Sequence, residues 1–154
     1  MNPRVLPFLL LLAACNPLAV ANSSDQEIDR FHQRWNAGQL DTIWRTAHPD
    51  FRAGPTKEQF INIMTLMGDA LGDTVDTERE GIQINTANGI TTTQIQMRTT
   101  FANGEGLETF TLRGEGDALQ LLYYNVQSPL LDPVAEQKPD GAQIQPAIPA
   151  AAGT

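Results

Sequence analysis

The sequence predicts an α+β fold in which three N-terminal helices pack on a curved four-stranded antiparallel sheet. Apolar residues recur at helical spacing through the first half of the chain, and the period changes to two from Thr74 onward. Turn signals then divide the second half into four strands. Because the helices precede the strands instead of alternating with them, we expect a meander with the helices on one of its faces.

The first two helices are expected on either side of Gly38. Ser24–Glu27 has the pattern of a capping box, so the first helix should begin there and end before Gly38. A short second helix should cover residues 40–47, because the position before Pro49 disfavours further helix. A loop that contains Phe51 should follow.

The third helix is expected to begin at Thr56–Gln59, a second capping box, and to close near Gly72. One apolar stripe runs through it, and its two methionines are interpreted as core filling. The stripe consists of Phe60, Ile63, Met64, Met67 and Leu71.

The strands are expected to meet at three turns. Asn88-Gly89 is a strong hairpin signal, because both turn positions need a positive φ. Asn103-Gly104 and residues 114–117 predict the other two turns, and residues 119–127 the last strand. The second strand alternates polar and less polar residues, so one of its faces should be buried. That face carries Ile95, Met97, Thr99 and Phe101.

Length and charge limit what the chain can do. Its 154 residues allow one ordinary domain, and 18 Asp+Glu against 10 Lys+Arg give a net charge of −8. This balance argues against nucleic-acid binding, which needs a basic surface. A single Cys excludes an internal disulfide and a cysteine-based zinc site. We predict a signal segment at 1–14, a tether at 15–24, a folded domain at 25–128 and a disordered Pro/Ala-rich tail at 129–154.

The first fifteen residues indicate export. One basic residue, Arg4, precedes about ten apolar residues, too few to span a bilayer but typical of a secretory signal. The run ends Leu12-Ala13-Ala14-Cys15, which resembles the lipobox of bacterial lipoproteins. The resemblance implies cleavage before Cys15 and acyl chains on its sulfur and new amine. Two or more acyl chains would hold the protein durably on a membrane.

Two other interpretations of this segment remain open. Ala19-Val20-Ala21 is an A-x-A pattern, and cleavage after Ala21 would release a soluble periplasmic or secreted protein. Alternatively, Cys15 is an ordinary buried thiol. If Cys15 is acylated, Asn16 in place of the Asp that retains enteric lipoproteins at the inner membrane favours the periplasmic side of the outer membrane.

The order of elements resembles an NTF2-like (cystatin-like) cone, and more narrowly the small NTF2-like lipoproteins of Gram-negative bacteria. The resemblance covers residues 25–128 and rests on spacing rather than on a catalytic signature. It implies helices closing over a bent sheet, often around a pocket, and dimers through the sheet. The segments that carry it are Phe31–Trp44, Thr56–Phe60, Thr100–Gly104, Glu108–Phe110 and Leu121–Val126.

Candidate chemistry is sparse. His48 and Asp50 flank Pro49 and could form an acid–base pair, although turn chemistry is the simpler interpretation. His32, on the first helix, is more typical of a structural histidine. Tyr123 and Tyr124 should point to opposite faces of the last strand, where one could donate a hydrogen bond into a pocket.

No other residues suggest a catalytic or metal site. In the ketosteroid isomerase branch of the resembled fold, a tyrosine works with two carboxyl groups, and Glu108 and Asp117 do not match that arrangement. The acidic residues Asp76, Glu78 and Glu80 are interpreted as a solvated strand edge rather than a calcium site. We therefore expect no metal and no cofactor.

The sequence favours a lipid-anchored envelope protein with a non-enzymatic binding domain for a peptide, a protein or a small apolar ligand. Fold alone does not settle function, so two alternatives stay open. One is a small acid–base enzyme that uses His48, Asp50 and a tyrosine. The other is a structural module that forms homodimers through its sheet.

Overall fold

The computed structural model describes residues 17–131, in which four helices precede a four-stranded antiparallel sheet. The strands follow one another across the sheet in the order β1-β2-β3-β4, as a meander requires. The predicted α+β class is confirmed. The helices are α1 (Pro17–Asn36), α2 (Leu40–Thr46), α3 (Pro49–Arg52) and α4 (Lys57–Leu71). The strands are β1 (Thr74–Ala87), β2 (Ile90–Phe101), β3 (Gly104–Arg113) and β4 (Gln120–Gln127), with 3-10 turns η1 (Gly116–Ala118) and η2 (Pro129–Leu131).

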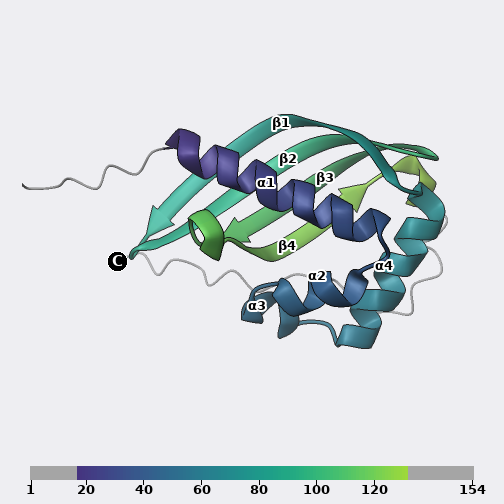
Figure 1. Cartoon of the computed structure of the whole chain (residues 1–154), viewed down its shortest axis with the longest axis horizontal. Coiled ribbons are helices and arrows are strands. Elements are labelled where there is room, and N and C mark those ends of the chain that lie inside the picture. Colours follow the sequence, from purple (N-terminus) through teal and green to yellow (C-terminus); the bar gives the residue numbers. More distant parts are fainter. Residues whose placement is uncertain (1–16, 132–154) are drawn as a thin grey trace, which may run out of the picture.

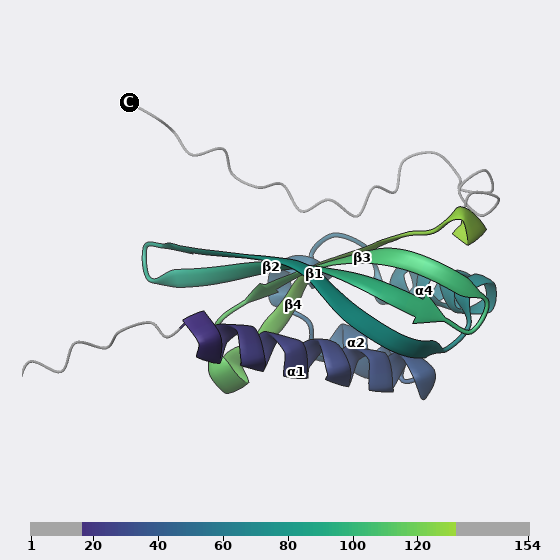
Figure 2. The same ribbon diagram turned by 90° about the horizontal axis from the view of Figure 1, so that it is seen from above.

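The sheet is curved, and α1 runs along its concave face (Figures 1 and 2). Buried residues on β2 alternate with exposed or half-buried ones, so this strand has one core face and one solvent face. On the core face, Ile95 pairs with Ile82 of β1 and with Phe110 of β3, which pairs with Tyr124 of β4. The opposite face is mostly polar. It carries Gln94, Gln96, Arg98, Thr100, Thr109, Thr111, Tyr123 and Asn125.

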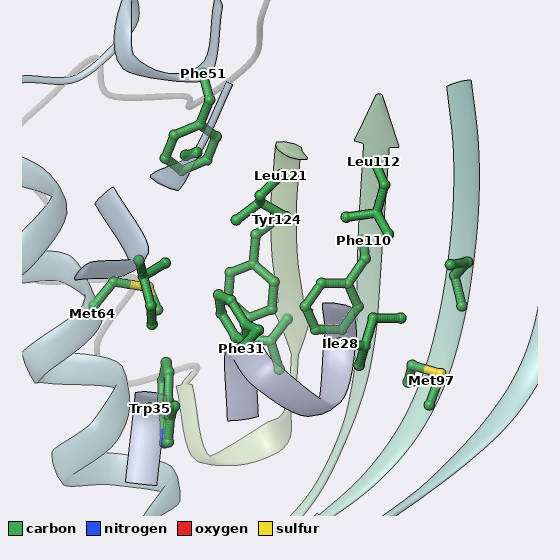
Figure 3. Packing of buried hydrophobic residues seen from close by; sticks show 14 of the residues in the cluster. Ile28, Phe31, Trp35, Phe51, Met64, Met97, Phe110, Leu112, Leu121 and Tyr124 are labelled. Atoms are coloured by element: carbon green, nitrogen blue, oxygen red, sulfur yellow. The ribbon is translucent and has the colours of Figure 1, made fainter. Parts of the chain in front are cut away.

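The core forms where α1 meets the sheet and where α2, α3 and α4 close one end of it. Figure 3 shows Phe31 of α1 beside Phe110 and Tyr124, with Trp35 and Met64 farther along. A second aromatic group joins Trp44, Phe51 and Phe60 at ring-centroid separations of 5.4 to 6.0 Å. Such edge-on and tilted contacts stabilise the fold by about 0.5–1.5 kcal/mol per pair, beyond the stabilisation from burying the rings.

The start of α1 differs from the prediction. The helix is already formed at Pro17, so residues 17–24 are not an extended tether and Ser24 is not its cap. Ser24 is fully buried within the helix, and Ala21 and Ile28 are buried on the same side. Small and apolar residues thus continue the packed face toward the N-terminus, and tertiary packing prevails over the local capping signal.

The segment around Phe51 also differs from the prediction of a loop, because it contains the single turn α3. His48 caps this turn, and its Nδ1 accepts a hydrogen bond from the backbone N–H of Asp50 at 3.1 Å. Pro49 occupies the first helical turn, where its missing N–H costs nothing. The turn places Phe51 in the core.

The other local signals are confirmed. Thr56 and Gln59 form both hydrogen bonds of a capping box, at 3.2 and 2.8 Å. Asn88 and Gly89 both have positive φ in the turn between β1 and β2. At the other end of the domain, η2 extends the described fold to Leu131, which packs against the core, so residues 129–131 belong to the domain rather than to the predicted tail.

The predicted signal segment, Cys15 and the remainder of the predicted tail lie outside the described residues. Between residues 17 and 131, no helix is both long enough and apolar enough to cross a membrane.

Gly72 offers a test of the junction between α4 and the sheet. Its φ is +79°, and an added Cβ would lie 2.9 Å from the Cβ of Ala102. We expect Gly72→Ala to lower the free energy of unfolding by about 2 kcal/mol, because backbone strain and a steric clash act together. Gly38→Ala is the control, since φ is +66° there but nothing lies within 4 Å; it should cost about 1 kcal/mol. Equal losses in urea denaturation would exclude the clash.

Candidate functional site

A fully buried carboxylate, Glu108, lies on the core face of β3. It takes a position in the strand alternation where Phe110 and Leu112 put apolar side chains. A carboxylate removed from water is costly unless hydrogen bonds replace its hydration. Its partners therefore decide whether this arrangement is stable.

Three side chains from three other elements surround the carboxylate. The phenol Oη of Tyr124 on β4 donates to Oε1 at 2.6 Å, and Nε2 of His32 on α1 lies 2.9 Å from Oε2. The hydroxyl of Thr99 on β2 also donates to Oε2. We call His32, Thr99, Glu108 and Tyr124 the Glu108 cluster.

Strand register explains why these residues meet. Glu108 pairs directly with Met97 on β2 and with Val126 on β4. Thr99 lies two positions after Met97 and Tyr124 two positions before Val126, so both are diagonal neighbours of Glu108 on the same face. Diagonal neighbours are close enough for long or aromatic side chains to interact. His32 then reaches the carboxylate from α1, which crosses above.

Aromatic rings enclose the cluster. The ring of Phe31 lies 5.1 Å from that of Phe110 and 4.7 Å from that of Tyr124, and the latter two are 5.0 Å apart. His32 also packs edge-on to Phe110 at 5.7 Å. These rings separate the carboxylate from water and strengthen the electrostatic interactions inside.

The electrostatics favour a neutral tyrosine. Burial raises the pKa of Tyr124 well above its ordinary value, and the charge of Glu108 and the hydrogen bond to it act in the same direction. The phenol therefore keeps its proton and remains a donor to Glu108 through the physiological range. The side chains of the cluster face one another, and none of the four residues is more than 7% exposed. Its evident role in this geometry is to join α1 to three strands.

The residues predicted as pocket candidates fall into separate places. His48 and Asp50 lie together at the start of α3, where Asp50 also accepts a hydrogen bond from Arg113 at 2.7 Å. The backbone N–H of His48 donates to the carbonyl of Leu121. These contacts fix α3 against the sheet, and none of the described hydrogen bonds joins this pair to Tyr124. Tyr123 is half-buried on the opposite face from Tyr124, as the alternation predicts. Cys15 lies outside the described residues.

Sequence reasoning missed the cluster because its members are far apart along the chain. His32 and Glu108 are separated by 76 positions. A signal was nevertheless present: Glu108 interrupts the apolar alternation of β3 and Thr99 that of β2. Two polar residues on the buried faces of neighbouring strands indicate a shared hydrogen-bonded site.

Within residues 17–131, no group of three or more His, Cys, Asp or Glu side chains could hold a metal ion. Asp76, Glu78 and Glu80 lie exposed along β1, which is an edge of the sheet. Glu80 forms an ion pair with Arg98 on β2. The acidic segment therefore has the position of a solvated edge.

Comparisons with known proteins do not identify a family for this chain. No family model and no curated protein matches the sequence. A solved structure from Catenulispora acidiphila aligns with 72% of this chain and 92% of its own, with 15% sequence identity and a TM-score of 0.47.

Tyr124→Phe tests the stabilising role of the cluster. The substitution keeps the ring but removes one hydrogen bond from a buried carboxylate, so we expect unfolding to become easier by about 1–3 kcal/mol. Tyr123→Phe is a matched control on the solvent side of the same strand, and it should change stability by less than about 0.5 kcal/mol. Equal effects of the two substitutions in chemical denaturation would contradict the assignment.

Alkaline pH offers a second test. Because the pKa of Tyr124 is raised in the folded protein, its contribution to stability is complete below about pH 10, where an unfolded tyrosine begins to ionise. The contribution is lost as the pH rises through the folded pKa. We expect the melting temperature of the wild type to fall more steeply above about pH 10 than that of Tyr124→Phe. Parallel curves would show that Tyr124 does not contribute.

Proposed function

We propose that the protein is a lipid-anchored component of the bacterial cell envelope whose NTF2-like domain is a non-enzymatic binding module. The observation that carries this proposal is the start of α1 at Pro17, two positions after the cysteine of the lipobox-like segment. The proposal has three parts: the anchor, the fold family and the binding role.

The length of α1 favours cleavage before Cys15 over cleavage after Ala21. Ala21 is buried, and Asp25, one turn later, pairs with Arg79 of β1 at 2.8 Å. Cleavage after Ala21 would remove Pro17 to Ala21 from a packed helix. Cleavage before Cys15 leaves Pro17–Asn36 intact and puts the acylated residue two positions before Pro17.

The architecture supports the resemblance to the NTF2-like cone. Helices precede a curved meander, and α1 covers the concave face. In this fold the interior can hold acid–base groups, but here the buried carboxylate is engaged by His32, Thr99 and Tyr124. Buried groups that satisfy one another are poorly placed to reach a substrate, which favours a binding role.

The solvent-facing surfaces favour a peptide or protein partner over a small apolar ligand. Buried side chains of the core occupy the concave face where α1 packs on it, so a partner would meet this part of the domain from outside. The outer face of the sheet is mostly polar, which gives little support to obligate dimerisation through it. Homodimerisation stays a prediction.

Labelling with a palmitate analogue tests the anchor. We expect the wild type to incorporate label and Cys15→Ser to lose it, because the sulfur is the site of acylation. Ala19→Gln is the control: position 19 is exposed on α1, and the change disrupts the Ala19-Val20-Ala21 pattern without burdening the helix. It should leave labelling and processing unchanged. Mature protein that begins at Asn22, or equal labelling of Cys15→Ser, would overturn the anchor.

A further inference from the structure

The free end of the β1–β2 hairpin exposes isoleucines. Ile82, Ile84 and Ile90 are 38%, 37% and 52% exposed. Exposed single apolar residues are common, but these three lie within one turn and its flanking strands. We refer to residues 82–91 as the hairpin end.

The hairpin end lies in a segment without charge. Residues 81–97 contain no Asp, Glu, Lys, Arg or His, although the preceding residues 73–80 contain five charged side chains. The first half of β1 therefore has the charges that keep a sheet edge in solution, whereas the second half lacks them. Such a neutral, isoleucine-bearing end suits a medium less polar than water.

The isoleucines occupy both faces of the hairpin. Ile82 pairs with Ile95 and Ile84 with Thr93, so they lie on the face that α1 covers. Ile90 precedes Thr91, which is buried on that face, and therefore points to the other side. A surface made for a single flat partner would carry its apolar residues on one face only. A hairpin that inserts into a lipid layer is surrounded by it, so apolar residues on both of its faces are buried.

The hairpin end and the start of α1 lie at the same end of the molecule. Figures 1 and 2 show the first turn of α1 and the β1–β2 turn on the same side, away from α4. The Asp25–Arg79 ion pair joins α1 to β1 farther from this end of the molecule. From that pair, α1 extends about 12 Å back to Pro17, and β1 extends about 26 Å to Ala87. The hairpin end therefore projects past the start of the helix.

We propose that the hairpin end docks into the interfacial layer of the bilayer to which Cys15 is anchored. This inference rests on the proposed lipid anchor. Only Asn16 separates Cys15 from Pro17, so the acylated residue lies within about 7 Å of the first residue of α1. The anchor thus brings the projecting isoleucines, and the exposed Leu18 in the first turn of α1, to the lipid surface.

The charges nearby indicate which lipids fit. Thr91 at the hairpin end hydrogen-bonds to Glu115, and the exposed Asp117 follows in η1. These carboxylates would be repelled by anionic headgroups. The docking surface therefore suits zwitterionic lipid, with apolar insertion rather than charge attraction as its driving force.

The test uses the acylated full chain in phosphatidylcholine vesicles. Because acylation occupies the one natural cysteine, an introduced cysteine is the only free thiol for an environment-sensitive fluorophore. Ile90→Cys carries the probe at the hairpin end, and Ile84→Cys carries it on the other face. Asn62→Cys, exposed on α4 at the opposite end of the domain, is the matched control. Flotation of the vesicles reports the anchor independently of the probe.

Brominated acyl chains should quench the probes at positions 84 and 90 by about twofold, since insertion to about 5–10 Å brings them to the acyl boundary. The probe at position 62 should keep its emission. Protein that floats but shows equal, water-like emission at all three positions overturns the docking and leaves the anchor standing. Protein that does not float overturns both. Shielding at position 90 without quenching by brominated lipid would identify a second copy of the chain as the occupant, and would also overturn the docking.

Discussion

The buried carboxylate of Glu108 is the constraint on which the arrangement of α1 and the sheet depends. A carboxylate at this depth is stable only when hydrogen-bond partners replace water at both of its oxygens. The hydrogen-bond partners come from α1, β2 and β4, so the helix and three strands must all be in register for the carboxylate to be satisfied. A one-residue slip in the register of β2 would move Thr99 to the other face of the sheet, and a slip of β4 would do the same to Tyr124. The cluster thus favours one pairing of the strands over its neighbours.

Aromatic residues around Glu108 stabilise the same pairing of the strands. Phe31, Phe110 and Tyr124 pack around the carboxylate, and each belongs to a different element. Their burial supplies apolar stabilisation at the same point where the hydrogen bonds supply specificity. Beyond this point, toward the hairpin end, the helix contributes Ala21 and Ser24 in place of aromatic side chains. The core therefore weakens along α1 from its C-terminal half toward its start, and the hairpin end projects beyond it.

Local signals in the sequence predicted most of the fold, because periodicity, capping boxes and Asn-Gly turns act within a few residues. The box at Thr56 formed as expected, while the equally good pattern at Ser24 did not. The difference is what precedes each one: a loop with Gly54 and Pro55 in the first case, and a small apolar stretch that can pack on the sheet in the second. Capping contributes about 1 kcal/mol, which a few buried side chains outweigh.

The site was harder to predict than the fold because it exists only through long-range pairing. His32 alone has the pattern of an ordinary helical histidine, and Glu108 alone does not match any catalytic motif. Strand register makes them neighbours, and register follows from turns that the sequence does predict at Asn88 and Asn103. Once β2 and β3 are aligned through the second of these turns, Thr99 and Glu108 become diagonal neighbours. Buried polar residues of adjacent strands, considered as pairs, would therefore have located most of the cluster.

A helix that begins next to an anchor has a different consequence from a flexible linker in the same place. A linker would let the domain search a wide volume above the membrane, with a reach that grows with its length. If Cys15 is acylated, a single residue separates the anchor from a helix that is itself part of the core. The 20 residues of α1 span about 30 Å. If Cys15 is acylated, the domain presents its surfaces within about that distance of the bilayer, and a partner must itself lie in the same layer of the envelope.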